Sequence, residues 1–119
     1  MARLTDPEIL QCYRNALLNW RFDGYIVFEK DAAEGLRKFL DGETQKGFKE
    51  LLYQFVIEEI GEIDQVLETR ENWKNKWSHH YDLRLIIDDL PIYVETRLDY
   101  SKPDDPDDPV IYLVNIHLV

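Results

Sequence analysis

Apolar residues in the first half of the chain recur every three or four positions, the spacing of one face of an α-helix. Three helices are predicted from this pattern, over residues 5–20, residues 30–40 and residues 44–60. Thr5-Asp6-Pro7-Glu8 predicts a capping box with a proline in the first turn of the first helix. Gly42 and Gly61 follow the other two helices, where a helix commonly ends. Residues 25–28 fit either a strand or the lead-in to a helix.

The second half of the chain changes to a period of two, which is typical of half-buried strands. Its first strand alternates two sets of side chains: Tyr81, Leu83, Leu85 and Ile87 against Asp82, Arg84, Ile86 and Asp88. A second strand is predicted over residues 92–99 and a third over residues 110–119, with residues 63–70 as a candidate edge strand. Residues 101–109 are predicted to form an acidic, proline-rich loop between the last two strands, because each proline removes a donor from the ladder.

These elements predict an α+β fold in which about three helices pack on a C-terminal antiparallel β-meander. The 119 residues suit one domain spanning 1–119, with 5–60 mostly helical and 63–119 mostly antiparallel sheet. A hydrophobic share of 45% is sufficient for one core. No apolar run is long enough to cross a bilayer, and the first residues lack a secretory pattern. We therefore expect no membrane contact and a cytoplasmic location.

The pairing of the first two meander strands decides which polar groups meet. A four-residue turn over residues 88–91 would place Ile87 opposite Ile92 and Leu85 opposite Val94. On the polar face, the same register pairs residues as follows: Arg84 with Glu95, and Asp82 with Arg97. The alternate face of the last strand offers Asn115 and His117, flanked by Ile111, Leu113 and Val119.

One face of the sheet is therefore predicted to carry a set of candidate catalytic residues: Arg84, Tyr93, Glu95, Arg97 and His117. Such a set suits acid-base chemistry on a phosphodiester, because a His or Glu can move a proton while arginines neutralise charge on the phosphate. The same charges also fit a structural role, since opposite charges across antiparallel strands stabilise many sheets. His117, on an otherwise apolar strand, fits either a catalyst or a hydrogen-bonded core histidine.

The metal-binding residue types do not form a recognisable site. His79 and His80 are adjacent, so on a strand they point to opposite faces, and the single Cys12 allows neither an internal disulfide nor a thiolate cluster. The aspartates of residues 101–109 lack the glycine and the closing glutamate of a calcium loop. Trp73 and Trp77, one helical turn apart, fit either packing over the sheet edge or a platform for bases. We expect neither a metal nor a cofactor.

The charge of the chain is strongly negative. Its 14 Lys and Arg against 24 Asp and Glu leave a formal net charge of −10. A field of this sign repels nucleic acid and favours basic partners. Any reading of the chain as a nucleic-acid enzyme has to accommodate that repulsion.

The order of elements resembles the MqsR and RelE-like group of bacterial toxins. The resemblance lies in residues 25–36 followed by a helix, and in three meander segments: His80-Tyr81-Asp82-Leu83-Arg84-Leu85, Ile92-Tyr93-Val94-Glu95-Thr96 and Val114-Asn115-Ile116-His117. Those toxins are ribonucleases of toxin-antitoxin systems, with helices on a curved antiparallel sheet and catalytic side chains on its open face. The resemblance implies acting groups at Arg84, Tyr93, Glu95, Arg97 and His117. The acidic charge departs from the basic character of those toxins.

Three functions follow from these observations. The resemblance implies a toxin-like endoribonuclease whose partners are an RNA substrate and an antitoxin. The net charge instead favours a non-enzymatic acidic protein, of the immunity or inhibitory type, that binds a basic protein. A third reading is a homodimeric domain of unknown role, for which the helix over residues 5–20 is a candidate dimerisation element.

Overall fold

The computed structural model describes residues 2–99 and 109–119, and it contains the three predicted helices. These are α1 (Pro7–Leu18), α2 (Lys30–Phe39) and α3 (Gln45–Tyr53), and α3 continues as a π-helical turn, η1 (Gln54–Glu58). Asp6 rather than Thr5 caps α1, because its Oδ1 accepts from the amides of Glu8 and Ile9 at 2.9 and 3.4 Å. The capping-box prediction was wrong in its capping residue, whereas the proline does stand in the first turn.

The strands form one sheet of mostly antiparallel order. They are β1 (Ala2–Arg3), β2 (Ile26–Phe28), β3 (Asp64–Leu67), β4 (His79–Ile87), β5 (Leu90–Asp99) and β6 (Val110–Leu118). Across the sheet they run β1-β3-β4-β5-β6-β2, and only the pairing of β2 with β6 is parallel. The predicted α+β fold and C-terminal meander are thus confirmed. Residues 25–28 contain a strand, and β3 lies one place in from the edge because β1 pairs outside it.

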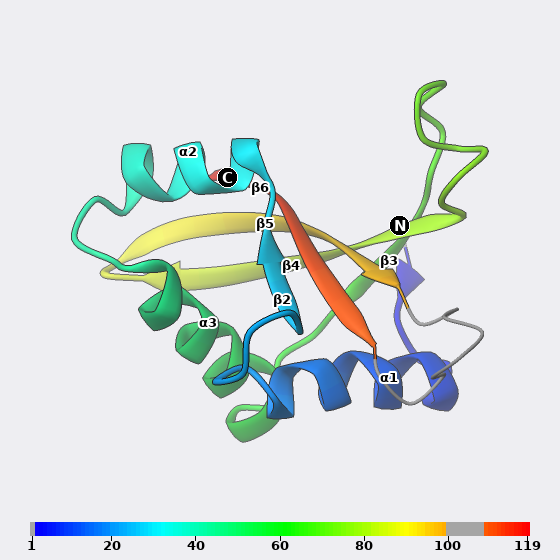
Figure 1. Cartoon of the computed structure of the whole chain (residues 1–119), viewed down its shortest axis with the longest axis horizontal. Coiled ribbons are helices and arrows are strands. Elements are labelled where there is room, and N and C mark those ends of the chain that lie inside the picture. The colour runs from blue at the N-terminus through cyan, green and yellow to red at the C-terminus, as the bar shows by residue number, and fades with distance from the viewer. Residues whose placement is uncertain (1, 100–108) are drawn as a thin grey trace.

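The hydrophobic core lies between the helices and one face of the sheet (Figure 1). It takes side chains from all three helices and from the alternating apolar positions of the meander, among them Leu17, Leu36, Phe48, Leu83 and Ile92. At Gly35, α2 approaches β6 so closely that an added Cβ would lie 2.0 Å from the carbonyl oxygen of Ile116. The apolar stripe of α1 packs into this core, with Tyr13, Ala16 and Leu17 buried.

The β4–β5 hairpin corrects the predicted register. Its turn has two residues, Asp88 and Asp89, both in the left-handed region with φ of 51° and 65°. Paired positive-φ residues match the right-handed twist of the flanking strands, which explains why the turn is two residues and not four. Ile87 therefore lies opposite Leu90 and Leu85 opposite Ile92.

The same correction changes the pairs on the polar face. Arg84 lies opposite Tyr93, not Glu95, and Asp82 lies opposite Glu95, not Arg97. A shift of two residues leaves every side chain on its predicted face, since side chains alternate with a period of two. The predicted faces of β4 and β5 are therefore correct, whereas the predicted pairs are wrong.

A β-bulge in β6 corrects the face assigned to its residues. Glu95 pairs with Asn115 but the next residue, Thr96, pairs with Leu113, so Val114 is the extra residue. The bulge reverses the alternation along β6. Leu113 points into the core, whereas Asn115 and His117 lie on the opposite, polar face with Glu95 and Tyr93.

None of the helices in the described part of the chain is long and apolar enough to cross a membrane.

Candidate functional site

The five predicted site residues share one face of the sheet, but they fall into two groups of different character. Arg84, Tyr93 and His117 occupy three adjacent strands at one row of the sheet. Further along β5, Glu95 and Arg97 are buried, with 7% and 3% of their surface exposed. The first group can meet a ligand from solvent, whereas the second is enclosed by other side chains.

The exposed group, which we call the His117 row, consists of Arg84, Tyr93 and His117. The ring centroids of Tyr93 and His117 are 4.7 Å apart at an interplanar angle of 33°, and the Arg84 guanidinium lies 5.9 Å from the Tyr93 ring. Arg84 also forms an ion pair with Asp64, at 3.5 Å, and its side chain is half exposed. Tyr93 thus stands between a cation and an imidazole, and it holds both on the same surface.

The hydrogen bond of His117 fixes its neutral tautomer. Its Nδ1 lies 2.8 Å from the carbonyl oxygen of Leu118. A carbonyl only accepts, so Nδ1 carries the proton and, in the neutral ring, Nε2 carries the lone pair. Nε2 has no hydrogen bond to another residue of the described chain, and is therefore the atom through which His117 could exchange a proton with a ligand.

Tyr93 is a donor at this site and does not act as a base. Its hydroxyl donates to Asp82, whose other oxygen lies 2.7 Å from Nδ1 of His80. Burial, followed by the bond to Asp82, raises the pKa of Tyr93 above its ordinary range. The phenol therefore stays protonated at physiological pH, and its ring packs against the ring of His117.

The second group belongs to what we call the buried network, in which Arg70, whose side chain is 47% exposed, joins three buried side chains: Glu68, Glu95 and Arg97. Arg70 bridges both carboxylates, with Nε 2.9 Å from Glu68 Oε1 and Nη2 2.5 Å from Glu95 Oε2. Arg97 Nη2 completes the network at 3.3 Å from Glu68 and 3.6 Å from Glu95. These contacts are structural, but they join β5 to the residues that follow β3 and are not the cross-strand pairs predicted from the sequence, Arg84 with Glu95 and Asp82 with Arg97.

The network shifts the pKa of Glu68 and of Arg70 in the directions expected for ion pairs. Burial alone would raise the pKa of Glu68, but hydrogen bonds and charge from Arg70 and Arg97 outweigh burial and lower it. The bonds to Glu95 and Glu68 raise the pKa of Arg70 further above its already high value. Glu68 and Arg70 are therefore both charged at neutral pH.

Sequence reasoning did not include Glu68 and Arg70 in the site. Both follow β3 and their side chains lie on the polar face, where they meet residues 25 to 29 positions further along the chain. The local signal was a Glu and an Arg two positions apart just after β3, which places both on one face of an extended segment. Asp82 and His80, which support Tyr93, were likewise not assigned to the site.

Trp73 and Trp77 cover the face of the sheet rather than its edge. The guanidinium of Arg97 lies 4.7 Å from the Trp73 ring and 5.8 Å from the Trp77 ring. The side chain of Arg97 is only 4% exposed, and its Nη1 has no hydrogen-bond partner among the described residues. This is an unsatisfied donor on a charged group, which proteins seldom leave buried.

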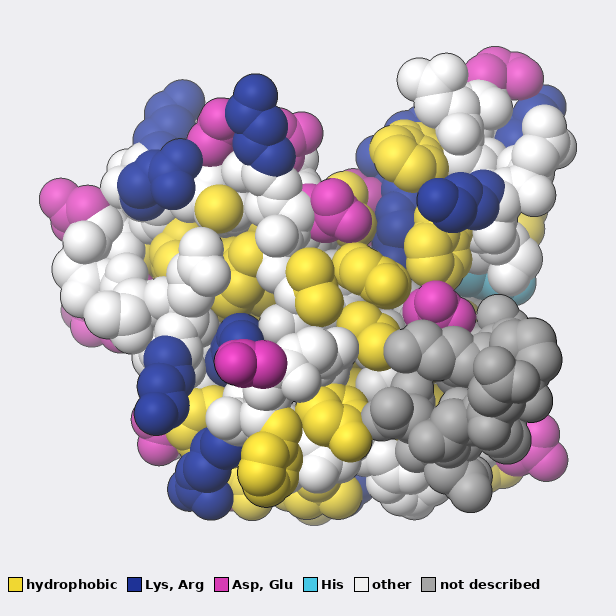
Figure 2. Space-filling model, viewed as in Figure 1, with side chains coloured by type: hydrophobic (Ala, Val, Ile, Leu, Met, Phe, Trp, Pro, Cys, Tyr) yellow, Lys and Arg dark blue, Asp and Glu magenta, His cyan; other side chains and the backbone are white. Residues whose placement is uncertain are grey.

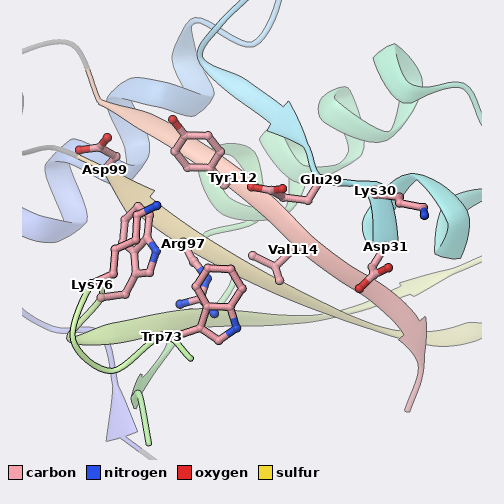
Figure 3. A pocket seen from close by; sticks show the side chains of 10 residues that line it. Glu29, Lys30, Asp31, Trp73, Lys76, Arg97, Asp99, Tyr112 and Val114 are labelled. Atoms are coloured by element: carbon pink, nitrogen blue, oxygen red, sulfur yellow. The ribbon is translucent and has the colours of Figure 1, made fainter. Parts of the chain in front are cut away.

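A cavity of about 740 Å³ opens beside Arg97, between the start of α2 and the segment 71–77 that bears the two tryptophans. Figure 2 shows the surface hollowed between these two parts of the molecule, with hydrophobic side chains between them. Its lining comprises Glu29, Lys30, Asp31, Trp73, Lys76, Trp77, Arg97, Asp99, Tyr112 and Val114 (Figure 3). The cavity lies on the same sheet face as the His117 row.

Residues 2–99 and 109–119 contain no group of three or more His, Cys, Asp or Glu side chains arranged to hold a metal ion. The aspartates at positions 104, 105, 107 and 108 of the predicted acidic loop lie outside the described residues.

Comparison with known proteins found no matching family model, no matching curated protein and no matching solved structure. The resemblance to MqsR and RelE-like toxins therefore rests on the sequence pattern alone.

Proposed function

We propose that this protein is a toxin-like endoribonuclease that cleaves RNA at the His117 row. The observation that carries the proposal is the position of His117, whose Nε2 has no partner among the described residues and whose ring packs on Tyr93, with Arg84 on the other side of Tyr93 and on the same accessible face of the sheet. A proton acceptor and a cation on one face are the two kinds of group needed to activate a ribose hydroxyl and to bind the adjacent phosphate.

The reaction proceeds without a cofactor. Nε2 of His117 takes the proton of the ribose 2′-hydroxyl, and the 2′-oxygen attacks the adjacent phosphorus. The bond from phosphorus to the 5′-oxygen of the next nucleotide breaks, and that oxygen takes the proton held by His117. The products are a 2′,3′-cyclic phosphate and a free 5′-hydroxyl. Arg84 binds the phosphate oxygens while negative charge develops on them.

The remaining residues of the predicted set support this reaction without touching the substrate. Tyr93 orients His117 through the contact of their rings, and Tyr93 is itself fixed because its hydroxyl donates a hydrogen bond to Asp82. Glu95 and Arg97 are bound in the buried network, so in this proposal they hold the sheet face and the segment 68–77 in place.

The test is inducible expression in bacteria of the wild type, His117→Ala and Arg84→Ala, followed by growth and by the integrity of total RNA and mRNA. General acid-base catalysis contributes roughly 100- to 10,000-fold to a rate, so His117→Ala should abolish growth arrest and RNA loss. His79→Ala is the matched control, because His79 bonds Ser78 and lies outside the His117 row.

Purified variants should first be checked for wild-type circular dichroism, since Arg84 is half exposed and its removal should leave the fold intact. Normal growth and intact RNA with the folded wild-type protein would refute the proposal. Cleavage that persists in folded His117→Ala would refute the role of His117.

A second candidate function is favoured by the net charge of −10, which suits an acidic protein that binds a basic partner without catalysis. Long-range steering by such a charge is weakened by salt, so the complex should form at low ionic strength and dissociate as salt is added. Copurification from cells at two salt concentrations distinguishes this function. An isolated protein at both concentrations would count against it.

A further inference from the structure

The cavity beside Arg97 carries equal numbers of opposite charges. Its cations and carboxylates are Lys30, Lys76 and Arg97 against Glu29, Asp31 and Asp99. The three carboxylates would repel a simple anion, and the three positive side chains would repel a simple cation. The lining therefore favours a ligand without net charge at the contact, one that offers hydrogen-bond acceptors on one edge and donors on another.

Arg97 has one buried hydrogen-bond donor without an acceptor among the described residues. Its Nη2 is bound to Glu68 at 3.3 Å, whereas Nη1 has no partner within the described chain, and the residue lines the cavity. A buried donor without a partner is unfavourable, so an acceptor delivered by a ligand would gain the bond that the protein itself does not make. Trp73 lies over this guanidinium, so the ligand has to enter alongside the indole.

Aromatic rings form the wall next to this donor. Trp73 is 39% exposed, and Trp77 and Tyr112 meet edge to face with ring centroids 6.1 Å apart. Figure 3 shows Trp73 and Arg97 on one side of the cavity and Asp31 at the start of α2 on the other. An accessible indole is a stacking surface for a flat ring, and the carboxylates opposite can accept from the amino or imino groups of such a ring.

The cavity is also within reach of the His117 row. Arg97 follows Tyr93 by four residues on β5 and on the same face, which corresponds to about 13 Å along the strand. A single strand of RNA whose phosphate meets Arg84 and His117 therefore passes the cavity with a neighbouring nucleotide.

We propose that this cavity binds a nucleobase of single-stranded RNA, with the base stacked on Trp73, an acceptor of the base on Arg97 and its donors on the carboxylates at the start of α2. The identity of the ligand as RNA rests on the proposed ribonuclease function. Binding of the base itself does not require cleavage, so the two proposals can fail separately.

The experiment records the indole N–H signals of the ¹⁵N-labelled protein while each of the four nucleoside 5′-monophosphates is added. The chain has three tryptophans, and Trp20 is buried away from the cavity, so it serves as an internal reference. At least one nucleotide should shift the signals of Trp73 and Trp77 saturably and leave Trp20 unmoved. Ribose 5-phosphate, which has the phosphate but no base, should shift none of them.

Variants separate stacking from general effects. Trp73→Ala should raise the dissociation constant roughly 5- to 140-fold, the loss expected for one base stacked on an aromatic ring. Phe22→Ala is the matched control, because Phe22 is 64% exposed and lies outside the cavity. His117→Ala should bind the nucleotide as the wild type does, although it should not cleave RNA.

Three results would overturn the base site: no shift with any of the four nucleotides, equal shifts with ribose 5-phosphate, or unchanged affinity in Trp73→Ala. Nucleotide binding with the expected loss in Trp73→Ala but without RNA cleavage by the wild type would support the base site and refute the ribonuclease. RNA cleavage by the wild type without any nucleotide binding in the cavity would support the ribonuclease and refute the base site.

Discussion

Replacing Glu68 by glutamine tests how strongly the buried ion-pair network stabilises the fold. The side chain of Glu68 is 1% exposed and contacts Arg70 and Arg97, and the side chain of Arg97 is only 4% exposed. Glutamine keeps the shape of Glu68 but removes its charge, so Arg97 keeps only Glu95 as a charged partner among the described residues. Breaking a buried pair by removing one member typically costs about 3–5 kcal/mol, because the other charge stays buried.

The matched control is Glu62→Gln. Glu62 pairs with Arg3 at 2.5 Å, but the two side chains are 63% and 56% exposed, so solvent screens the pair. Such surface pairs contribute about 0–1 kcal/mol. The two variants remove the same group from an ion pair and differ chiefly in burial.

The assay is urea unfolding followed by circular dichroism. With a denaturant slope of roughly 1.5 kcal/mol per molar, Glu68→Gln should lower the midpoint by about 2–3 M, and Glu62→Gln by less than about 0.7 M. Equal small shifts in the two variants would refute the argument, since they would show that burial of the network adds nothing to the effect of losing a charge.

Three further predictions follow from other parts of the structure. The ionised Glu68 stabilises the fold fully above the ordinary glutamate pKa of about 4.3, and this stabilisation is lost as the pH falls through the lowered pKa of the folded state. Glu68→Gln should therefore flatten the acid side of the stability–pH profile measured by urea unfolding. Tyr93, whose pKa is raised, should stay protonated when exposed phenols ionise at about pH 10, and Tyr93→Phe should remove one late-ionising group of the seven tyrosines in an ultraviolet titration. Gly35→Ala places a Cβ 2.0 Å from a backbone oxygen and should cost about 1–3 kcal/mol or more in thermal unfolding, whereas Gly42→Ala, with nothing within 4 Å, should cost little.

The sequence predicted those features of the fold that depend on the periodic burial of side chains within a single helix or strand. Helical spacing located α1, α2 and α3, and the period of two assigned the faces of β4 and β5, because burial of one face imposes these periods within a single segment. The alternation also selected Arg84, Tyr93 and His117, which the structure brings together.

What the sequence did not predict depends on backbone geometry between residues. The register of the hairpin was set by positive φ at Asp88 and Asp89, for which two aspartates are a weaker signal than Asn-Gly. The bulge at Val114 could not be predicted from the alternation, because the residues around it are mostly apolar and do not show which face each side chain takes. The network around Arg97 joins β5 to residues that follow β3, a contact between distant segments that no local pattern reports.

The two edges of the sheet constrain how a partner can bind. The edge strands, β1 and β2, are two and three residues long, while the long strands β4, β5 and β6 lie between them. These short strands leave parts of two long strands uncovered, because β2 pairs with β6 only at residues 111–113 and β3 pairs with β4 only at residues 79–82. The rest of β6 is met by α2, which packs on the carbonyl of Ile116 at Gly35. On β4, the outer side of residues 83–87 has no strand partner among the described residues. A foreign strand, from a protein partner or from a second copy of this chain, would therefore gain most backbone hydrogen bonds by adding beside residues 83–87.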